Sequence, residues 1–126
     1  MTMSGNQALI LAFIGAFNAN DLQQIMEFFH VDAVYHNMPV DPVQGVEAIR
    51  GIIQGFLGLA TEVDWVVHNI AEAESGAVLT ERTDRFLIQG NWIELPVMGS
   101  FVVRDGKLAE WRDYFDMKQF QSQLPA

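Results

Sequence analysis

The sequence contains no cysteine. This absence excludes disulfide bonds, thiol nucleophiles and metal centres held by cysteine, and it is typical of a reducing compartment. Basic residues are scarce as well: seven Lys and Arg stand against sixteen Asp and Glu, so the formal net charge is −9. Nucleic acids and anionic membrane surfaces both attract clustered positive charge. We therefore expect neither nucleic acid nor a membrane as a partner.

Long apolar runs are also missing, and we expect no secretory or mitochondrial leader segment. The longest apolar stretch, residues 8–17, is only half of the roughly 20 residues that span a bilayer. A secretory or mitochondrial signal has a basic start, whereas the first Lys or Arg of this chain is Arg50. We expect a cytoplasmic protein.

The chain does contain enough apolar material for a core. Half of its 126 residues are hydrophobic and only 18% are charged, which excludes wholesale disorder. Two domains would each be too small for a good core, and no linker or repeat divides the sequence. We predict a single domain over residues 1–126.

The first part of the chain has helical periodicity. Ser4 and Asp21 can cap two successive helices, the second of which reaches Phe29. Residues 33–37 have a short β-like pattern, and residues 45–59 predict a third helix with one apolar side.

After residue 60 the pattern changes to a period of two. Turn signals stand at Ser75-Gly76, Gly90-Asn91 and Asp105-Gly106. The strands between them are long, so the sheet must twist and curl. We predict an α+β fold in which a curved antiparallel or mixed sheet, extended by residues 33–37, forms a cone with about three N-terminal helices packed across it.

One carboxylate interrupts an apolar face of the last predicted strand. Asp113 lies on the same face as Trp111, Phe115 and Met117, because alternate residues of a strand share a face. An unpaired buried carboxylate is costly, so we expect Asp113 to have a partner or a shifted pKa. The alternative is a strand end that water already reaches.

The predicted strand over residues 77–89 carries a second charged pair. Arg82 and Asp84 share one face with Phe86, but both faces of this strand mix charged and apolar residues. An exposed row of charges is the alternative for this strand.

Tyr35 and Asn37 form a third pair on one strand face, together with Val31 and Ala33. The three histidines are scattered without ligand spacing and predict no metal site. The sequence also has no nucleophile elbow and no phosphate-binding glycine loop.

These pairs carry a resemblance to a known family. The chain resembles the limonene-1,2-epoxide hydrolases, within the nuclear-transport-factor-2-like (SnoaL-like) superfamily of α+β cones, from the first helix to about Phe120. The resemblance rests on three motifs in this order: Tyr35-x-Asn37, Arg82-x-Asp84 and Trp111-x-Asp113 followed by Tyr114 and Phe115.

The resemblance implies a one-step hydrolysis without an ester intermediate. Asp113 would be the general base that takes a proton from water, and Tyr35 and Asn37 would hold the same water. Asp84 would be the general acid that protonates the epoxide oxygen. Arg82 would lie between the two carboxyl groups and orient both.

Electrostatics favours the same division of roles. Two charged aspartates and one arginine sum to −1, whereas one charged aspartate, one protonated aspartate and one arginine sum to zero and are cheaper to bury. We expect coupled titration of Asp84 and Asp113 and a bell-shaped or broad pH–rate profile. The chemistry requires no metal and no organic cofactor.

The expected substrate is a small apolar epoxide, either aliphatic, alicyclic or terpenoid, which water converts to a vicinal diol. Trp111, Phe86 and Phe115 are predicted to bind it, and the chain is expected to form a homodimer. Three alternatives stay open: a SnoaL-like isomerase or cyclase, a small-molecule-binding module of the same fold, and a hydrolase with a nucleophilic aspartate.

Overall fold

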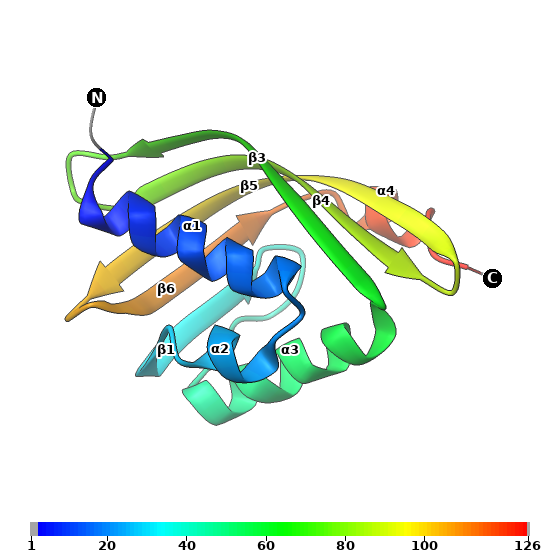
Figure 1. Cartoon of the computed structure of the whole chain (residues 1–126), viewed down its shortest axis with the longest axis horizontal. Helices are drawn as coiled ribbons and strands as arrows, with labels where there is room; N and C mark the ends of the chain where they lie inside the picture. Colours follow the sequence, from blue (N-terminus) through cyan, green and yellow to red (C-terminus); the bar gives the residue numbers. More distant parts are fainter. Residues whose placement is uncertain (1–2, 126) are drawn as a thin grey trace.

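A computed structural model describes residues 3–125 and shows one curled, six-stranded mixed sheet with helices on one side (Figure 1). The strand order across the sheet is β2-β1-β6-β5-β4-β3. The elements follow along the chain as α1 (Gly5–Asn18), α2 (Leu22–Met26), β1 (Phe29–Asn37), β2 (Val43–Gln44), α3 (Val46–Leu59), β3 (Glu62–Glu72), β4 (Val78–Ile88), β5 (Asn91–Arg104), β6 (Lys107–Tyr114) and α4 (Met117–Gln121). The predicted α+β cone is confirmed.

The first two helices begin where the capping residues predict. Ser4 forms a capping box with Gln7 at the start of α1, and the side chain of Asp21 accepts a hydrogen bond from the Gln24 amide in α2. The second helix is shorter than predicted, since it ends at Met26 and Phe29 already begins β1.

Strands β3 to β6 form the predicted antiparallel meander. Gln89 and Gly90 both have positive φ, as do Asp105 and Gly106, which is the geometry of a two-residue hairpin turn. The β4–β5 turn therefore lies one residue earlier than the predicted Gly90-Asn91.

Strand β1 joins the meander by parallel pairing with β6, so the sheet is mixed. The register of this pair shifts between Phe29 and Val34. A bulge breaks strict alternation. Val31, predicted to share a face with Ala33, is consequently 65% exposed while Ala33 is wholly buried.

The C-terminal end also differs from the prediction. The last strand stops at Tyr114, and Asp116 caps α4 by accepting hydrogen bonds from the amides of Lys118 and Gln119. Met117 therefore lies in a helix. Beyond it, Gln123 bonds to the backbone of Glu94 and holds this end of the chain against β5.

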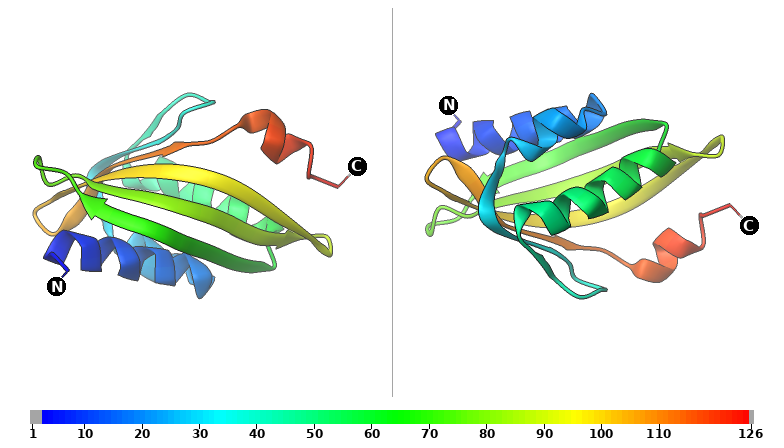
Figure 2. Two further views of the ribbon diagram at one scale, coloured as in Figure 1. Left: turned by 90° about the horizontal axis from the view of Figure 1, so that it is seen from above. Right: turned by 90° about the horizontal axis from the view of Figure 1, so that it is seen from below.

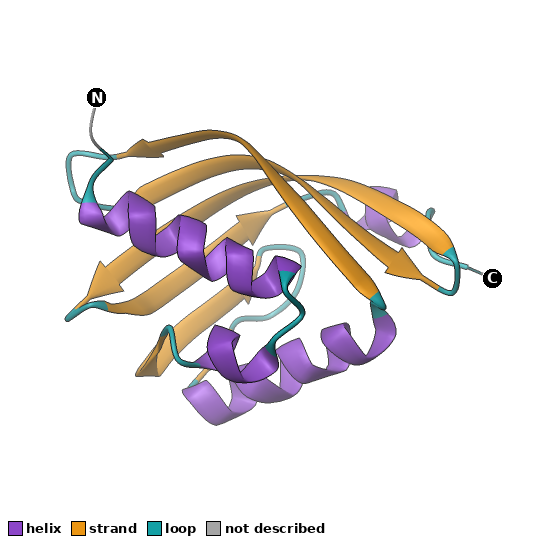
Figure 3. Ribbon diagram, viewed as in Figure 1, coloured by secondary structure: helices purple, strands orange, loops and turns teal. Residues whose placement is uncertain are grey.

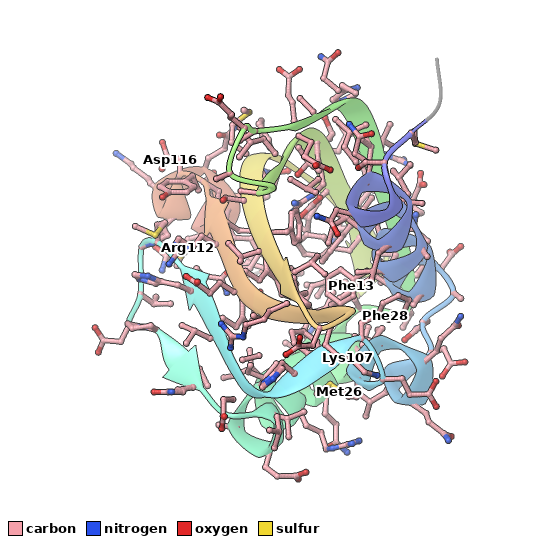
Figure 4. The ribbon with its side chains drawn as sticks, turned by 90° about the vertical axis from the view of Figure 1, so that its left-hand side faces the viewer. Phe13, Met26, Phe28, Lys107, Arg112 and Asp116 are labelled. Carbon is pink, nitrogen blue, oxygen red and sulfur yellow. The ribbon has the colours of Figure 1, made fainter. Side chains whose placement is uncertain are left out.

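The core lies between the sheet and the N-terminal helices. Figure 2 shows α3 in front of the sheet from one side and behind it from the other. The sheet face turned away from α3 carries no helix of residues 3–125. Figure 3 shows the same layers coloured by element type. Phe13 of α1 points toward Phe28 (Figure 4), with ring centroids 5.6 Å apart, and meets Trp111 edge to face at 5.1 Å. Within residues 3–125, no helix is long and apolar enough to cross a membrane.

Candidate active site

The inner face of β4 carries the charged pair. Alternate residues from Val78 to Ile88 are buried, so Arg82 and Asp84 face the helices with Phe86. This settles the question of which face is inward. Asp113 reaches the same interior from β6, two strands away, and is 4% exposed.

Arg82 contacts both aspartates at once. Its Nε and Nη2 donate to Asp84 at 2.9 and 2.8 Å, and its Nη1 and Nη2 donate to Asp113 at 3.2 and 2.9 Å. The remaining hydrogen of Nη1 goes to Oγ1 of Thr80 at 3.1 Å. A guanidinium has five N–H donors, so every donor of this buried group has an acceptor.

Aromatic rings enclose the guanidinium. Its carbon lies 5.1 Å from the ring centroid of Trp65 and 5.9 Å from that of Phe101, which are cation–π distances. The Arg82 side chain has no exposed surface. The charge is therefore stabilised by its two carboxyl partners and by the faces of the rings rather than by water.

Trp111 supports Asp113 from behind. Its indole Nε1 donates to Oδ1 of Asp113 at 2.9 Å, and its ring stacks on Tyr35 at 4.0 Å. Trp111 is wholly buried and is not among the residues that line the cavity. The structure thus places it beside the carboxylate, whereas the sequence pattern predicted a contact with substrate.

Tyr35 and Asn37 come to the same place through the parallel pairing of β1 and β6. Tyr35 lies in register with Trp111, and Asn37 with Asp113. Burial, and after it the negative charge of Asp113, raises the pKa of Tyr35 well above its ordinary value. Tyr35 is therefore a neutral hydrogen-bonding group.

The environment of Asp84 favours its protonated form. Burial raises the pKa of Asp84 to about 6, and the charge of Asp113 acts in the same direction, although the hydrogen bonds and charge of Arg82 oppose it. Burial opposes the charged form of Arg82, but its two carboxyl partners outweigh this and raise its pKa. With Asp84 protonated, the cluster has no net charge.

A cavity of about 200 Å³ opens beside this cluster. Its polar end is formed by Tyr35, Asn37, Asp84 and Asp113, and Arg82 lies behind them. The predicted contacts Phe86 and Phe115 line the wall. The other lining residues are apolar: Phe17, Val40, Ile52, Ile53, Phe56, Trp65, Leu95, Val97, Met117 and Phe120. The cavity suits a small apolar molecule with a polar reacting group.

Several lining residues were not predicted from the sequence, most of them on helices. Ile52 and Ile53 lie on the side of α3 that the sequence predicts to be apolar, but nothing in the sequence places them in a site. Ile52 is 47% exposed, so part of that side faces the cavity instead of the core. Phe120 belongs to α4, which was not predicted.

His36 and His68 make separate local contacts. His36 Nε2 lies 3.0 Å from the Val40 carbonyl, and His68 Nε2 lies 2.7 Å from the Thr83 hydroxyl. In the described part of the chain, no three His, Asp or Glu side chains are grouped so that they could hold a metal ion.

The fold defines the class of protein first. The chain superposes on a SnoaL-like protein from Shewanella putrefaciens CN-32, with a TM-score of 0.86 over 97% of each chain. The two sequences are 16% identical, so this similarity establishes a SnoaL-like cone and nothing about activity.

The family follows from the sequence. Residues 4–126 match the limonene-1,2-epoxide hydrolase catalytic domain, and the chain belongs to that family. It is 33% identical over 109 residues to the epoxide hydrolase EphG of Mycobacterium tuberculosis (strain ATCC 25618 / H37Rv), covering 84% of this chain and 70% of that protein. It also resembles a solved LEH-like epoxide hydrolase of M. tuberculosis, with a TM-score of 0.82, 29% identity and coverage of 94% and 88%. The predicted resemblance is confirmed.

Proposed function

We propose that this chain is an epoxide hydrolase that adds water to a small apolar epoxide, aliphatic, alicyclic or terpenoid, and releases a vicinal diol. Membership of the limonene-1,2-epoxide hydrolase family and the identity to EphG support this activity. The observation that carries the proposal is the contact of one buried guanidinium with two carboxyl groups at the polar end of an apolar cavity.

In the proposed reaction, water attacks one epoxide carbon while Asp113 takes a proton from it. The carbon–oxygen bond at that carbon breaks, and the protonated Asp84 gives its proton to the leaving oxygen. Tyr35 and Asn37 hold the attacking water next to Asp113. Asp113 gains one proton in this step and Asp84 loses one. A proton transfer from Asp113 to Asp84 therefore restores both groups before the next turnover.

The two carboxyl groups suit opposite roles because their environments differ. Asp84 has a raised pKa and can carry the proton that an acid needs. Asp113 accepts hydrogen bonds from Arg82 and from Trp111, which favour a charged acceptor. Each general acid or base step contributes roughly 10²–10⁴-fold to a rate. Arg82 orients both groups, and the proposed chemistry uses no cofactor.

An isotope experiment tests this mechanism. The enzyme, in excess over cyclohexene oxide, is allowed one turnover in ¹⁸O-labelled water, and the diol is analysed by mass spectrometry. Direct attack by water places one ¹⁸O atom in the diol in the first turnover. A nucleophilic aspartate would instead transfer its own unlabelled oxygen and would contradict the proposal.

The same assay separates the other functions that this fold allows. If none of a panel of aliphatic, alicyclic and terpenoid epoxides yields a diol, the hydrolase proposal fails. An isomerase, a cyclase or a binding module of the SnoaL-like fold would then be the better explanation.

The expected homodimer is also part of this proposal. The sheet face without helices exposes large apolar residues, and Met98 and Tyr114 lie in register on neighbouring strands with exposures of 53% and 48%. A second copy of the chain is the occupant that we propose for this face. Sedimentation should give a dimer for the native protein and a monomer for Met98→Lys. The single domain over residues 1–126 and the cytoplasmic location stay predictions.

A further inference from the structure

A glycine occupies the middle of a central strand, where glycine is unfavourable. Gly99 lies inside β5, is buried, and its φ is not positive. A glycine in a strand interior weakens the strand and often marks a place where another group approaches the backbone closely. Since no backbone conformation requires glycine here, the reason lies in what faces it.

The group that faces Gly99 is the Arg82 cluster. A Cβ atom at this position would lie 2.5 Å from Nη1 of Arg82 and 2.9 Å from both Oδ1 of Asp113 and Oγ1 of Thr80. Five other glycines without positive φ would meet nothing within 4 Å: Gly5, Gly15, Gly51, Gly55 and Gly58. The close approach is therefore particular to Gly99.

Strand register explains why these groups meet. Thr80 pairs with Gly99 across β4 and β5, and Gly99 pairs with Asp113 across β5 and β6. The three positions form one row across the sheet, with an oxygen acceptor at each end and no side chain in the middle. The Nη1 atom of Arg82 lies over this gap and donates to both ends.

Arg82 has no other place for Nη1. All its N–H donors are engaged, its side chain is fully buried, and aromatic rings cover its faces. A methyl group on Gly99 would push Nη1 away from its two acceptors, and the loss of Thr80 as an acceptor would leave one charged donor unpaired.

We propose that Gly99 and Thr80 are positioning residues, which hold Arg82 where it can contact Asp84 and Asp113 together. Gly99 does so by leaving space for Nη1, and Thr80 does so by accepting its remaining hydrogen. The expected effect on turnover rests on the proposed hydrolase function. The positioning of Arg82 by Gly99 and Thr80 can be tested without turnover.

The first test compares Gly99→Ala with Gly15→Ala, a matched substitution in α1 that meets nothing within 4 Å. We expect Gly99→Ala to lose about 100-fold in kcat/KM on cyclohexene oxide, as small misplacements of catalytic groups do. Its pH–rate profile should also move to higher pH, because a displaced cation stabilises the charged carboxylates less. Gly15→Ala should retain both. A folded Gly99→Ala with wild-type kcat/KM and profile would overturn the proposal.

The second test uses Thr80, so that a folding defect in Gly99→Ala does not end the question. Thr80→Ser keeps the hydroxyl and should retain turnover, while Thr80→Val keeps the shape and should lose at least about 10-fold with a displaced pH profile. Equal activity of the two variants would contradict the role of Thr80.

A third readout separates this inference from the proposed function. Carboxyl ¹³C shifts of Asp84 and Asp113 are followed by NMR against pH in the wild type and in Thr80→Val, without substrate. The hydrolase proposal fails if the wild type forms no diol. The positioning role still stands in that case if Thr80→Val shifts the titration of the two carboxyl groups and Thr80→Ser does not. An unchanged titration in Thr80→Val overturns the positioning role even in an active hydrolase.

Discussion

Asp84 is the residue whose proton decides what the site can do. Its side chain is 7% exposed and lies 2.8 Å from Arg82, yet its pKa is raised because burial outweighs the attraction of the cation. The negative charge of Asp113, which lies 2.9 Å from the same cation, raises this pKa further. Asp84 therefore keeps its proton to a higher pH than an exposed aspartate does.

This arrangement predicts the pH dependence of turnover. Since the acid form of Asp84 is required and its pKa is about 6, kcat/KM should fall as the pH rises through that value. It should fall again in acid, when both carboxyl groups are protonated and no base is left. Initial rates on cyclohexene oxide from pH 4 to 9 measure this profile. A rate that rises steadily with pH would contradict a protonated Asp84.

Removal of either carboxyl group should abolish most of the activity for different reasons. Asp84→Asn cannot donate a carboxylic proton, and Asp113→Asn cannot accept a proton from water, so each should lose roughly 10²–10⁴-fold in kcat. Asp113→Asn also leaves Arg82 with Asp84 alone, which should lower the pKa of Asp84 and move the alkaline limb of the residual activity to lower pH.

Asp41→Asn is the matched control for charge, because Asp41 is exposed and does not line the cavity. It should retain wild-type kcat. Circular dichroism on each variant shows that the fold is intact. A folded Asp84→Asn or Asp113→Asn with full turnover would remove that residue from the mechanism.

At the scale of the elements, much of the site could be predicted because its signal is a charge on an apolar strand face. Because Trp111 and Phe115 flank Asp113 on one face, the alternation favours a buried carboxylate over a strand end that water reaches, and the structure buries Asp113. The neighbouring strand β4 did not reveal its inward face, because Arg82, Asp84 and Arg85 put charges on both sides. One side of β4 is buried because the helices pack against it in the core, and the sequence of the strand does not show which side that is.

Other features had no local signal. The shifted register near Val31 depends on how β1 meets β6, a partner about 80 residues away along the chain. Helix α4 is too short for a periodic pattern, although Asp116 is a good cap. Gly99 appears in the sequence as an ordinary strand residue, and only the position of Arg82 across the sheet explains it.

Helix α3 allows a prediction about stability. Gly55 lies inside this helix, has no positive φ, and a Cβ there would meet nothing within 4 Å. Gly55→Ala should therefore raise the free energy of unfolding by about 1 kcal/mol, the difference between these residues in a helix interior. Gly45→Ala is the contrasting variant and should destabilise, because the φ of Gly45 is +94°. Urea unfolding measures both, and a destabilised Gly55→Ala would contradict the open space at this position.

The burial of the acid pair is a property of the whole molecule. Three strands supply Arg82, Gly99 and Asp113, while Phe17 of α1 and Ile53 of α3 close the cavity from the helical side. Each layer alone would leave the carboxyl groups in water, where both would ionise. Curling the sheet around them provides the low polarity that raises the pKa of Asp84, so stability and proposed activity depend on the same enclosure.

This coupling predicts how the stability of the whole protein depends on pH. Because the folded-state pKa of Asp84 is raised from 3.8 to about 6, the folded state binds more protons than the unfolded state between these values, and stability falls as pH rises. The contribution is fully present below about pH 4 and lost above about pH 6. Asp84→Asn lacks this contribution. As the pH rises across this window, the wild type should therefore lose a few kcal/mol of unfolding free energy that Asp84→Asn does not lose, because a tenfold change in proton affinity corresponds to about 1.4 kcal/mol.

Urea unfolding from pH 4 to 8 tests this, with Asp41→Asn as the control for net charge. A difference between Asp84→Asn and wild type that stays constant with pH would show that Asp84 is ionised in the folded protein.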